Sequence, residues 1–197
     1  MSDDSDLVAA LRPVVAEFQR LGVRYYLGGS VASSFHGASR STLDVDIAAE
    51  LDEANASRFV DALKSQYYVS EAAVREAMRF RTCFNLIHLA TSFKVDIFVS
   101  RNREFDRQAQ QRALDEKLGA AEPMDVRVAS PEDILLAKLE WFRLGNESSE
   151  RQWSDVMRVA SLQRSRLDLE YLRHWAQELG VLELLERLLS AAQIAGQ

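Results

Sequence analysis

Apolar and polar positions along the first part of the chain follow two periods, that of a helix and that of a strand. The segment "DSDLVAALRPVVAEFQRLG" places apolar residues three or four positions apart, from Leu7 to Phe18. This spacing predicts an amphipathic helix that ends at Gly22. The run "VRYYL" predicts a strand, and residues 30–36 predict a short helix after a turn at Gly28 and Gly29. In "TLDVDIAAEL" apolar and acidic residues alternate, which is typical of a half-exposed strand.

The middle of the chain continues this mixture of helices and strands. Residues 52–64 and "EAAVREAMRF" predict helices, and "QYYVS" between them predicts a short strand. The runs "CFNLIHL" and "FKVDIFV" both alternate, and only "ATS" separates them, so we expect an antiparallel hairpin. We also expect a charged, exposed helix over Glu104–Leu118 and one more strand at "MDVRVAS".

From Pro131 onward the pattern becomes helical. In "SPEDILLAKLEWFRLG" we expect Ser130 as the N-cap, Pro131 at the first helical position and Gly145 at the end. Two or three further helices are expected before about Ile194, with breaks near residues 163–167 and at Gly180. The predicted fold is α/β (α+β): a mixed sheet flanked by helices over residues 1–128, with a helical bundle over 129–197 packed on it.

Composition and charge narrow the class of protein. The chain has 197 residues, of which 47% are hydrophobic, and a formal charge of −6. An acidic balance argues against a surface devoted to long duplex nucleic acid. The single cysteine, Cys83, cannot form an internal disulfide, which suits a reducing compartment. The first residues lack the pattern of a signal peptide, and no apolar run approaches the roughly 20 residues of a membrane span. We therefore expect a cytoplasmic protein with no membrane partner.

Acidic residues recur on two of the predicted strands. In "LDVDI", Leu43, Val45 and Ile47 share one face, and Asp44 and Asp46 share the other. Two close carboxylates repel each other unless a cation compensates, and Mg²⁺ is a usual partner of such pairs.

The second strand repeats this design. In "FKVDIFV" Asp96 shares a face with Lys94, which can balance its charge. If the two strands are neighbours, three carboxylates converge, as in a two-metal site. The alternative is that these acidic residues only mark the solvent face of the sheet.

A glycine pair precedes the acidic strand. Gly28 and Gly29 lie between a strand and a short helix, where glycine lets the backbone approach a ligand closely. The amino end of the following helix can bind an anion, and Ser30 can cap it or offer its hydroxyl to a phosphate. By itself this motif is also common in ordinary turns.

Together, these motifs resemble those of the nucleotidyltransferase superfamily of the DNA polymerase β type. The matching positions are Leu27, Gly28-Gly29-Ser30, Asp44 and Asp46, and Asp96. The stretch "HGASRSTLDVDI" also resembles a bacterial subgroup with an arginine and a threonine before the first aspartate, here Arg40 and Thr42.

Within the superfamily, the chain is similar to small AbiEii toxin-like, or minimal bacterial, nucleotidyltransferases. In those proteins a Pro-Glu-Asp helix carries a lysine and the next helix carries an aspartate. The corresponding residues here are Lys138 in "SPEDILLAKLEWFRLG" and, by a looser match, Asp155 in "RQWSDVMRVA".

The resemblance implies an enzyme that transfers a nucleoside monophosphate from a triphosphate to an acceptor hydroxyl. Asp44, Asp46 and Asp96 would bind Mg²⁺ or Mn²⁺ and carry out catalysis. The implied nucleotide contacts are Gly28, Gly29, Ser30, Arg40, Thr42 and Lys138. The implied acceptor is the 3′ end of tRNA, with the enzyme acting as a toxin beside an antitoxin protein.

Two alternatives are compatible with the same motifs. One is an enzyme that transfers the nucleotide to an antibiotic, such as an aminoglycoside or a lincosamide. The other is a module of the same fold that binds nucleotides without catalysis.

Overall fold

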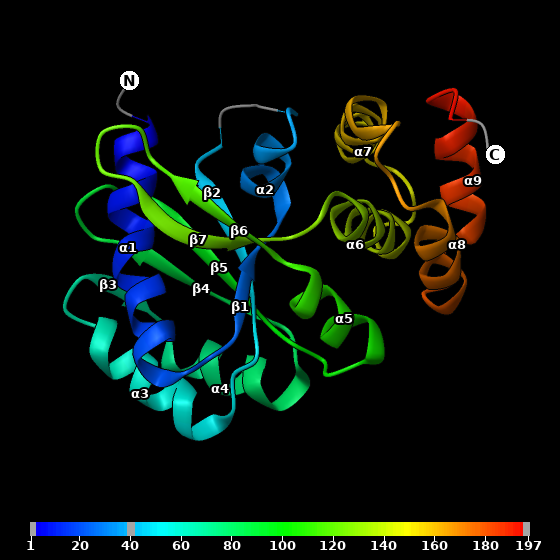
Figure 1. Cartoon of the computed structure of the whole chain (residues 1–197). Helices are drawn as coiled ribbons and strands as arrows, with labels where there is room; N and C mark the ends of the chain where they lie inside the picture. Colours follow the sequence, from blue (N-terminus) through cyan, green and yellow to red (C-terminus); the bar gives the residue numbers. More distant parts are fainter. Residues whose placement is uncertain (1–2, 39–41, 195–197) are drawn as a thin grey trace. The chain divides into compact units, whose positions relative to one another are not determined.

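A computed structural model describes residues 3–38 and 42–194. The chain divides into two compact units (Figure 1). The first comprises Met1–Val31 and Ser41–Ala129, and the second comprises Ala32–Arg40 and Ser130–Gln197. The predicted boundary at residues 128–129, and the packing of the bundle on the sheet, stay predictions.

The described part of the first unit is built on one mixed sheet of seven strands in the order β3-β4-β5-β2-β1-β7-β6. The strands are β1 (Tyr25–Leu27), β2 (Asp44–Ala49), β3 (Tyr67–Val69), β4 (Cys83–His88), β5 (Lys94–Val99), β6 (Leu114–Leu118) and β7 (Met124–Val128). The β2–β5 and β1–β7 pairs are parallel, and the other neighbouring pairs are antiparallel. The predicted α/β fold with a mixed sheet is confirmed.

Three helices of the first unit cover one face of this sheet: α1 (Asp3–Leu21), α3 (Glu53–Leu63) and α4 (Glu71–Phe80). Helix α1 contacts β5 and β7, and α4 contacts β4 (Figure 1). The fully buried ring of Phe18 on α1 stacks on Phe59 of α3 at 4.6 Å and on Tyr25 of β1 at 5.3 Å. Apolar side chains at alternate strand positions therefore form the core beneath these helices.

The hairpin predicted between "CFNLIHL" and "FKVDIFV" is confirmed as β4 and β5. Its turn is longer than the predicted "ATS", because Leu89 lies outside β4 and is 61% exposed. Leu43, which was predicted to share a strand face with Val45 and Ile47, likewise lies before β2 and is 73% exposed. Both residues are at strand ends, where alternation no longer dictates burial.

The helix predicted over Glu104–Leu118 is wrong in its second half. Helix α5 (Glu104–Arg112) ends at Ala113, which has an extended conformation, and the next residues form β6. Strand β6 pairs with β7, and cross-strand ion pairs join Lys117 to Asp125 and Asp115 to Arg127. The charged sequence favours a helix locally, but pairing with a neighbouring strand decides the outcome. Helix α5 also buries Phe105, Ala109 and Gln110, so it is not simply exposed.

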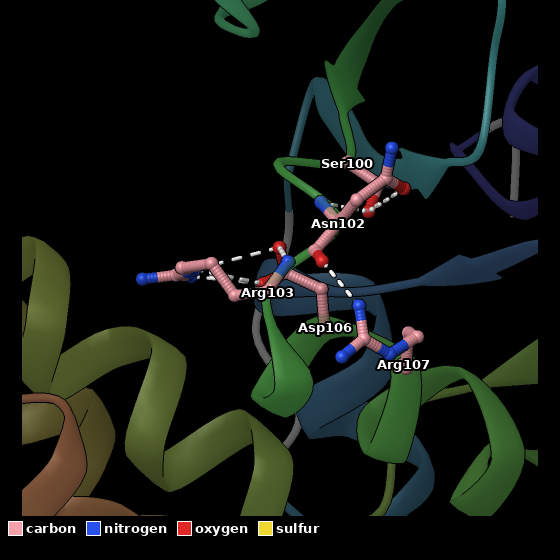
Figure 2. A network of polar contacts seen from close by, with 5 residues as sticks. All are labelled: Ser100, Asn102, Arg103, Asp106 and Arg107. Atoms are coloured by element: carbon pink, nitrogen blue, oxygen red, sulfur yellow. Dashed lines mark hydrogen bonds and ion pairs between the residues drawn. The ribbon is translucent and has the colours of Figure 1, made fainter.

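A polar network fixes the chain where β5 leads into α5 (Figure 2). The Asp106 carboxylate accepts hydrogen bonds from the backbone N–H of Arg103 at 3.0 Å and from its guanidinium at 2.9 Å. Arg107 donates to the carbonyl of Asn102 at 2.5 Å, and the Asn102 N–H donates to the Ser100 hydroxyl at 3.1 Å. These bonds cap the start of α5 and hold the end of β5 in place.

The second unit is helical, as predicted. Its helices after residue 130 are α6 (Pro131–Leu144), α7 (Glu150–Gln163), α8 (Leu169–Glu178) and α9 (Leu182–Ala191). The Ser130 hydroxyl caps α6 by accepting from the Asp133 N–H at 3.2 Å, and Gly145 ends it, both as predicted. The short helix α2 (Gly29–Phe35) begins in the first unit and continues into the second, where Gln163 donates to the His36 carbonyl at 3.0 Å.

Among the described residues, every helix is too short or too polar to cross a membrane.

Candidate active site

Two parallel strands bring the predicted carboxylates together. Strands β2 and β5 pair so that Asp46 lies opposite Asp96, and Asp44 lies opposite Lys94. The intervening residues of both strands, Val45, Ile47, Val95 and Ile97, are fully buried under the helices. Since side chains alternate along a strand, the three aspartates and Lys94 share the other face of the sheet.

The neighbouring strands extend this arrangement in register. The Gly28 N–H at the end of β1 donates to the Asp46 carbonyl at 2.8 Å. On the other side, Asn85 of β4 lies opposite Asp96. Gly28, Asp46, Asp96 and Asn85 therefore form one row across four adjacent strands. The Gly28 N–H serves strand pairing in this row.

Gly29 lies directly against the Asp46 carboxylate. Its φ is +56°, and a Cβ added there would lie 1.6 Å from Oδ2 of Asp46. A Cβ on Gly28 would instead meet atoms of Asp46 only at ordinary distances of 3.9 Å and more. Of the two glycines, Gly29 is thus the one where a Cβ would both take a left-handed backbone and displace the Asp46 carboxylate.

Asp96 and Asp44 each have a side-chain partner in the first unit. The Lys94 ammonium lies 2.7 Å from Oδ2 of Asp96, and the side chains are 41% and 13% exposed. The Thr42 hydroxyl donates to Oδ1 of Asp44 at 2.5 Å. The hydrogen bond to Asp96 raises the pKa of Lys94 against the effect of burial, and the negative charges of Asp96, Asp44 and Asp46 add to the rise.

In the part of the chain that the structure describes, no three His, Cys, Asp or Glu side chains converge closely enough to form a metal site. On the shared face, Asp96 is turned to Lys94 and Asp44 to Thr42. The strands thus provide three carboxylates in register on one face, and the side-chain conformations pair Asp96 with Lys94 and Asp44 with Thr42.

Cys83 lies on the same face of the sheet as Asn85 and Asp96. It pairs with Phe98 across β4 and β5, two positions along from the pair of Asn85 and Asp96. Burial raises the pKa of the Cys83 thiol to about 12, and the negative charges of Asp96 and Asp46 contribute to the rise. The raised pKa of the thiol is therefore due first to burial, and the charges of the candidate site add to it.

The remaining predicted site residues lie in different surroundings. Ser30 is 7% exposed and lies in the first turn of α2, so the N-cap predicted for it falls one or two residues earlier. Arg40 lies outside the described residues. Lys138 of α6 pairs with Asp155 of α7 at 3.5 Å, and both side chains are 15% exposed. Their roles in nucleotide binding or catalysis stay predictions.

Sequence reasoning missed Asn85 and the bond between Thr42 and Asp44. A signal for Asn85 was present, because it is the polar residue of β4 between the buried Phe84 and Leu86. Its alternation places it on the face of Asp96, and the hairpin register then makes the two residues neighbours.

No family model and no curated protein matches the chain in sequence. Three solved structures resemble it over nearly its whole length. The solution structure of the antibiotic-resistance factor ANT(2'')-Ia has a TM-score of 0.55 at 16% identity and covers 96% of each chain. A crystal structure of ANT(2'')-Ia in complex with adenylyl-2''-tobramycin has a TM-score of 0.53 at 14% identity, over 92% of this chain and 97% of that one.

The third structure is an antigenic nucleotidyltransferase-like protein from Paracoccidioides brasiliensis. Its TM-score is 0.52 at 16% identity, over 98% of this chain and 92% of that one. The closer similarity to AbiEii-type proteins stays a prediction from the motifs. The chain has the nucleotidyltransferase fold that its sequence motifs predict.

Proposed function

We propose that the protein is a nucleotidyltransferase that moves a nucleoside monophosphate from a triphosphate to an acceptor hydroxyl. The observation that carries this proposal is the row in which Asp46 pairs with Asp96 while its carboxylate lies against Gly29. A glycine-built bend beside in-register carboxylates suits a site where a phosphate chain must come close to backbone and acid groups. The nucleotidyltransferase fold supports the same conclusion.

The residues fit a divalent metal by their chemistry. Carboxylate oxygens are the ligands that Mg²⁺ and Mn²⁺ prefer, and Asp44, Asp46 and Asp96 supply them on two adjacent strands. The Lys94 ammonium lies on the Asp96 carboxylate, so one of these three aspartates already binds a positive charge. When bound, the metal would neutralise charge on the phosphates and orient them.

In the proposed reaction, the residues of the chain have different roles. Asp96 would accept the proton of the acceptor hydroxyl, whose oxygen forms a bond to the α-phosphorus. The bond from that phosphorus to the bridging oxygen breaks, and pyrophosphate leaves with the electron pair. Gly29 and Ser30 would contact the phosphates. In-line attack of this kind depends mostly on positioning and charge stabilisation.

For the acceptor we favour a small hydroxylated molecule. ANT(2'')-Ia, which has been solved with adenylyl-2''-tobramycin, resembles this chain over nearly the full length of both proteins. The formal charge of −6 also suits a cationic small molecule better than a polyanion. The motifs shared with AbiEii-type toxins favour the tRNA 3′ end as the second candidate, with an antitoxin as partner.

The test is transfer of α-labelled nucleotides with Mg²⁺ or Mn²⁺, comparing aminoglycosides, lincosamides and bulk tRNA as acceptors. We expect label on a small molecule and release of pyrophosphate. Asp46→Asn should reduce transfer to background at an unchanged melting temperature. Asp61→Asn is the matched control, because Asp61 is an exposed aspartate of α3 that pairs with Lys64.

Label on tRNA alone would move the assignment to the second candidate. Full transfer by Asp46→Asn would contradict the carboxylate site. Triphosphate binding with no pyrophosphate released for any acceptor would favour a module that binds nucleotides without catalysis.

A further inference from the structure

Lys94 is a lysine on the same sheet face as the three aspartates of the candidate site. It is the register partner of Asp44 across β2 and β5, and it precedes Asp96 by two residues on the same face. Its ammonium lies 2.7 Å from the Asp96 carboxylate. One cation thus sits among three carboxylates that two parallel strands keep side by side.

Without a cation, this arrangement of carboxylates would be unfavourable. Like charges held at neighbouring positions of a sheet repel each other. Lys94 offsets this repulsion from within the chain. The ammonium lies on Oδ2 of Asp96, so a divalent ion bound to the same carboxylate would be close to a second positive charge, and the two cations would repel each other.

The two partners differ in their freedom to move. The Lys94 side chain is 41% exposed, whereas that of Asp96 is 13% exposed. A lysine has a flexible four-carbon stem, so its ammonium can move away from the carboxylate without disturbing the buried residues of β5. Asp96 stays in place because its neighbours Val95 and Ile97 are fully buried.

We propose that Lys94 is an internal counter-cation that neutralises the carboxylates of Asp44, Asp46 and Asp96 and is exchanged for a divalent ion when one binds. The identity of the ion rests on the proposed function. After the exchange the released ammonium remains next to the carboxylates. There it would be available to bind the negatively charged triphosphate of the proposed reaction.

The exchange predicts opposite effects of one substitution. Lys94→Gln removes the competing cation and a positive charge beside the ion, so the affinity for Mn²⁺ should rise. A close charge changes the affinity of a carboxylate for a proton by roughly ten- to a thousandfold, so we expect an increase of roughly tenfold or more. In EDTA the same variant should melt at a lower temperature than wild type, because the carboxylates are then uncompensated.

The experiment measures Mn²⁺ binding by electron paramagnetic resonance and melting temperature with EDTA or Mg²⁺. Lys117→Gln is the matched control, since Lys117 also pairs with an aspartate across strands at 2.9 Å, on the edge strand β6. The control should bind Mn²⁺ like wild type. Lys94→Gln should bind more tightly and should gain more melting temperature from Mg²⁺ than wild type does.

The outcomes separate this proposal from the function on which it rests. Equal or weaker Mn²⁺ binding by Lys94→Gln, with binding by wild type, overturns the exchange and leaves the metal site standing. No Mn²⁺ binding by either protein overturns the metal site and the exchange together. Binding by Lys94→Gln alone supports the exchange, because Lys94 then excludes the ion in wild type.

A second variant, Lys94→Arg, tests the proposal if Lys94→Gln does not fold. A Lys94→Gln protein that folds only with Mn²⁺ supports the exchange. If it folds in neither condition, Lys94→Arg decides, since a guanidinium should bind Asp96 more firmly and lower the affinity for Mn²⁺. Unchanged affinity in Lys94→Arg would overturn the proposal.

Discussion

The two faces of β2 and β5 differ sharply although they share one backbone. On the helix-covered face, Val45, Ile47, Val95 and Ile97 are fully buried and apolar. On the other face, Asp44, Asp46, Lys94 and Asp96 are charged and only partly buried. Adjacent residues of the same strand are therefore expected to serve different purposes, stability on one face and chemistry on the other.

The comparison also shows how a fold tolerates such a charged surface. The apolar face is stabilised by burial and close packing, which is worth roughly 1.5–3 kcal/mol for each fully buried large aliphatic side chain. The charged face contributes repulsion among carboxylates, and Lys94 and Thr42 partly offset it. The covered face thus holds the carboxylates in a register that they would not adopt by themselves.

The sharpest test of the charged face is Gly29→Ala. The added Cβ would lie 1.6 Å from Oδ2 of Asp46, so the carboxylate must move, and we expect transfer activity to fall to background. The left-handed backbone of Gly29 adds a stability loss of roughly 1–2 kcal/mol.

Gly22→Ala is the control for Gly29→Ala. Gly22 has a φ of +66°, and a Cβ there would meet nothing within 4 Å. It should lose a similar amount of stability, measured by urea unfolding, and keep its activity. Full activity in Gly29→Ala would mean that the contact with Asp46 has no functional role.

Cys83 allows the charge of the carboxylate face to be measured chemically. With its pKa raised to about 12 from an ordinary 9.0, the thiol should react with iodoacetamide at pH 8 roughly a thousandfold more slowly than in the urea-unfolded chain. Only the thiolate reacts, so the folded rate should keep rising about tenfold per pH unit up to pH 10, whereas the unfolded rate levels off near pH 9.

Asp96→Asn should speed the reaction of folded Cys83, because the charge of Asp96 contributes to the raised pKa. The matched comparison is Asp61→Asn on α3, which should leave the rate unchanged. An unchanged rate in Asp96→Asn would show that the thiol does not sense this carboxylate. A folded rate that levels off near pH 9 would contradict the raised pKa, whose main cause is burial.

A smaller effect is expected from Ile97→Val, next to Asp96 on the covered face. Removing one methylene from a fully buried isoleucine should cost roughly 0.5–1.5 kcal/mol of unfolding free energy. The activity per folded molecule should not change. Asp96→Asn should show the reverse pattern, with transfer lost and stability changed by less than about 1 kcal/mol, as is usual for partly exposed ion pairs.

Chemical unfolding and initial rates at a temperature well below melting separate these two effects. A fall in turnover of folded Ile97→Val would mean that the two faces are coupled. The assignment of stability to one face and chemistry to the other would then be wrong.

Much of the candidate site was predictable because its signals are local. Alternation within "LDVDI" and "FKVDIFV" assigns each side chain to a face, and the glycine pair marks the bend before them. The hairpin of β4 and β5 follows from two alternating runs with a short connection. In the second unit, the caps of α6 were predictable from Ser130 and Gly145 for the same reason.

Other features depended on which segments become neighbours. Residues 114–118 read as a helix, yet they pair with β7 as a strand, since a strand partner supplies hydrogen bonds that local propensity does not foresee. Asn85 lies at the site because strand register places it opposite Asp96, and Thr42 because its hydroxyl donates to Asp44.

The residue pattern alone determines the two faces of β2 and β5, because alternation is a property of a single strand. The tertiary structure decides that Asp46 lies opposite Asp96 and that Lys94 lies opposite Asp44 on the same face. These strands are parallel, and nearly fifty residues separate Asp46 from Asp96 along the chain. No local period can set an alignment across that connection, so long-range packing of the sheet sets it.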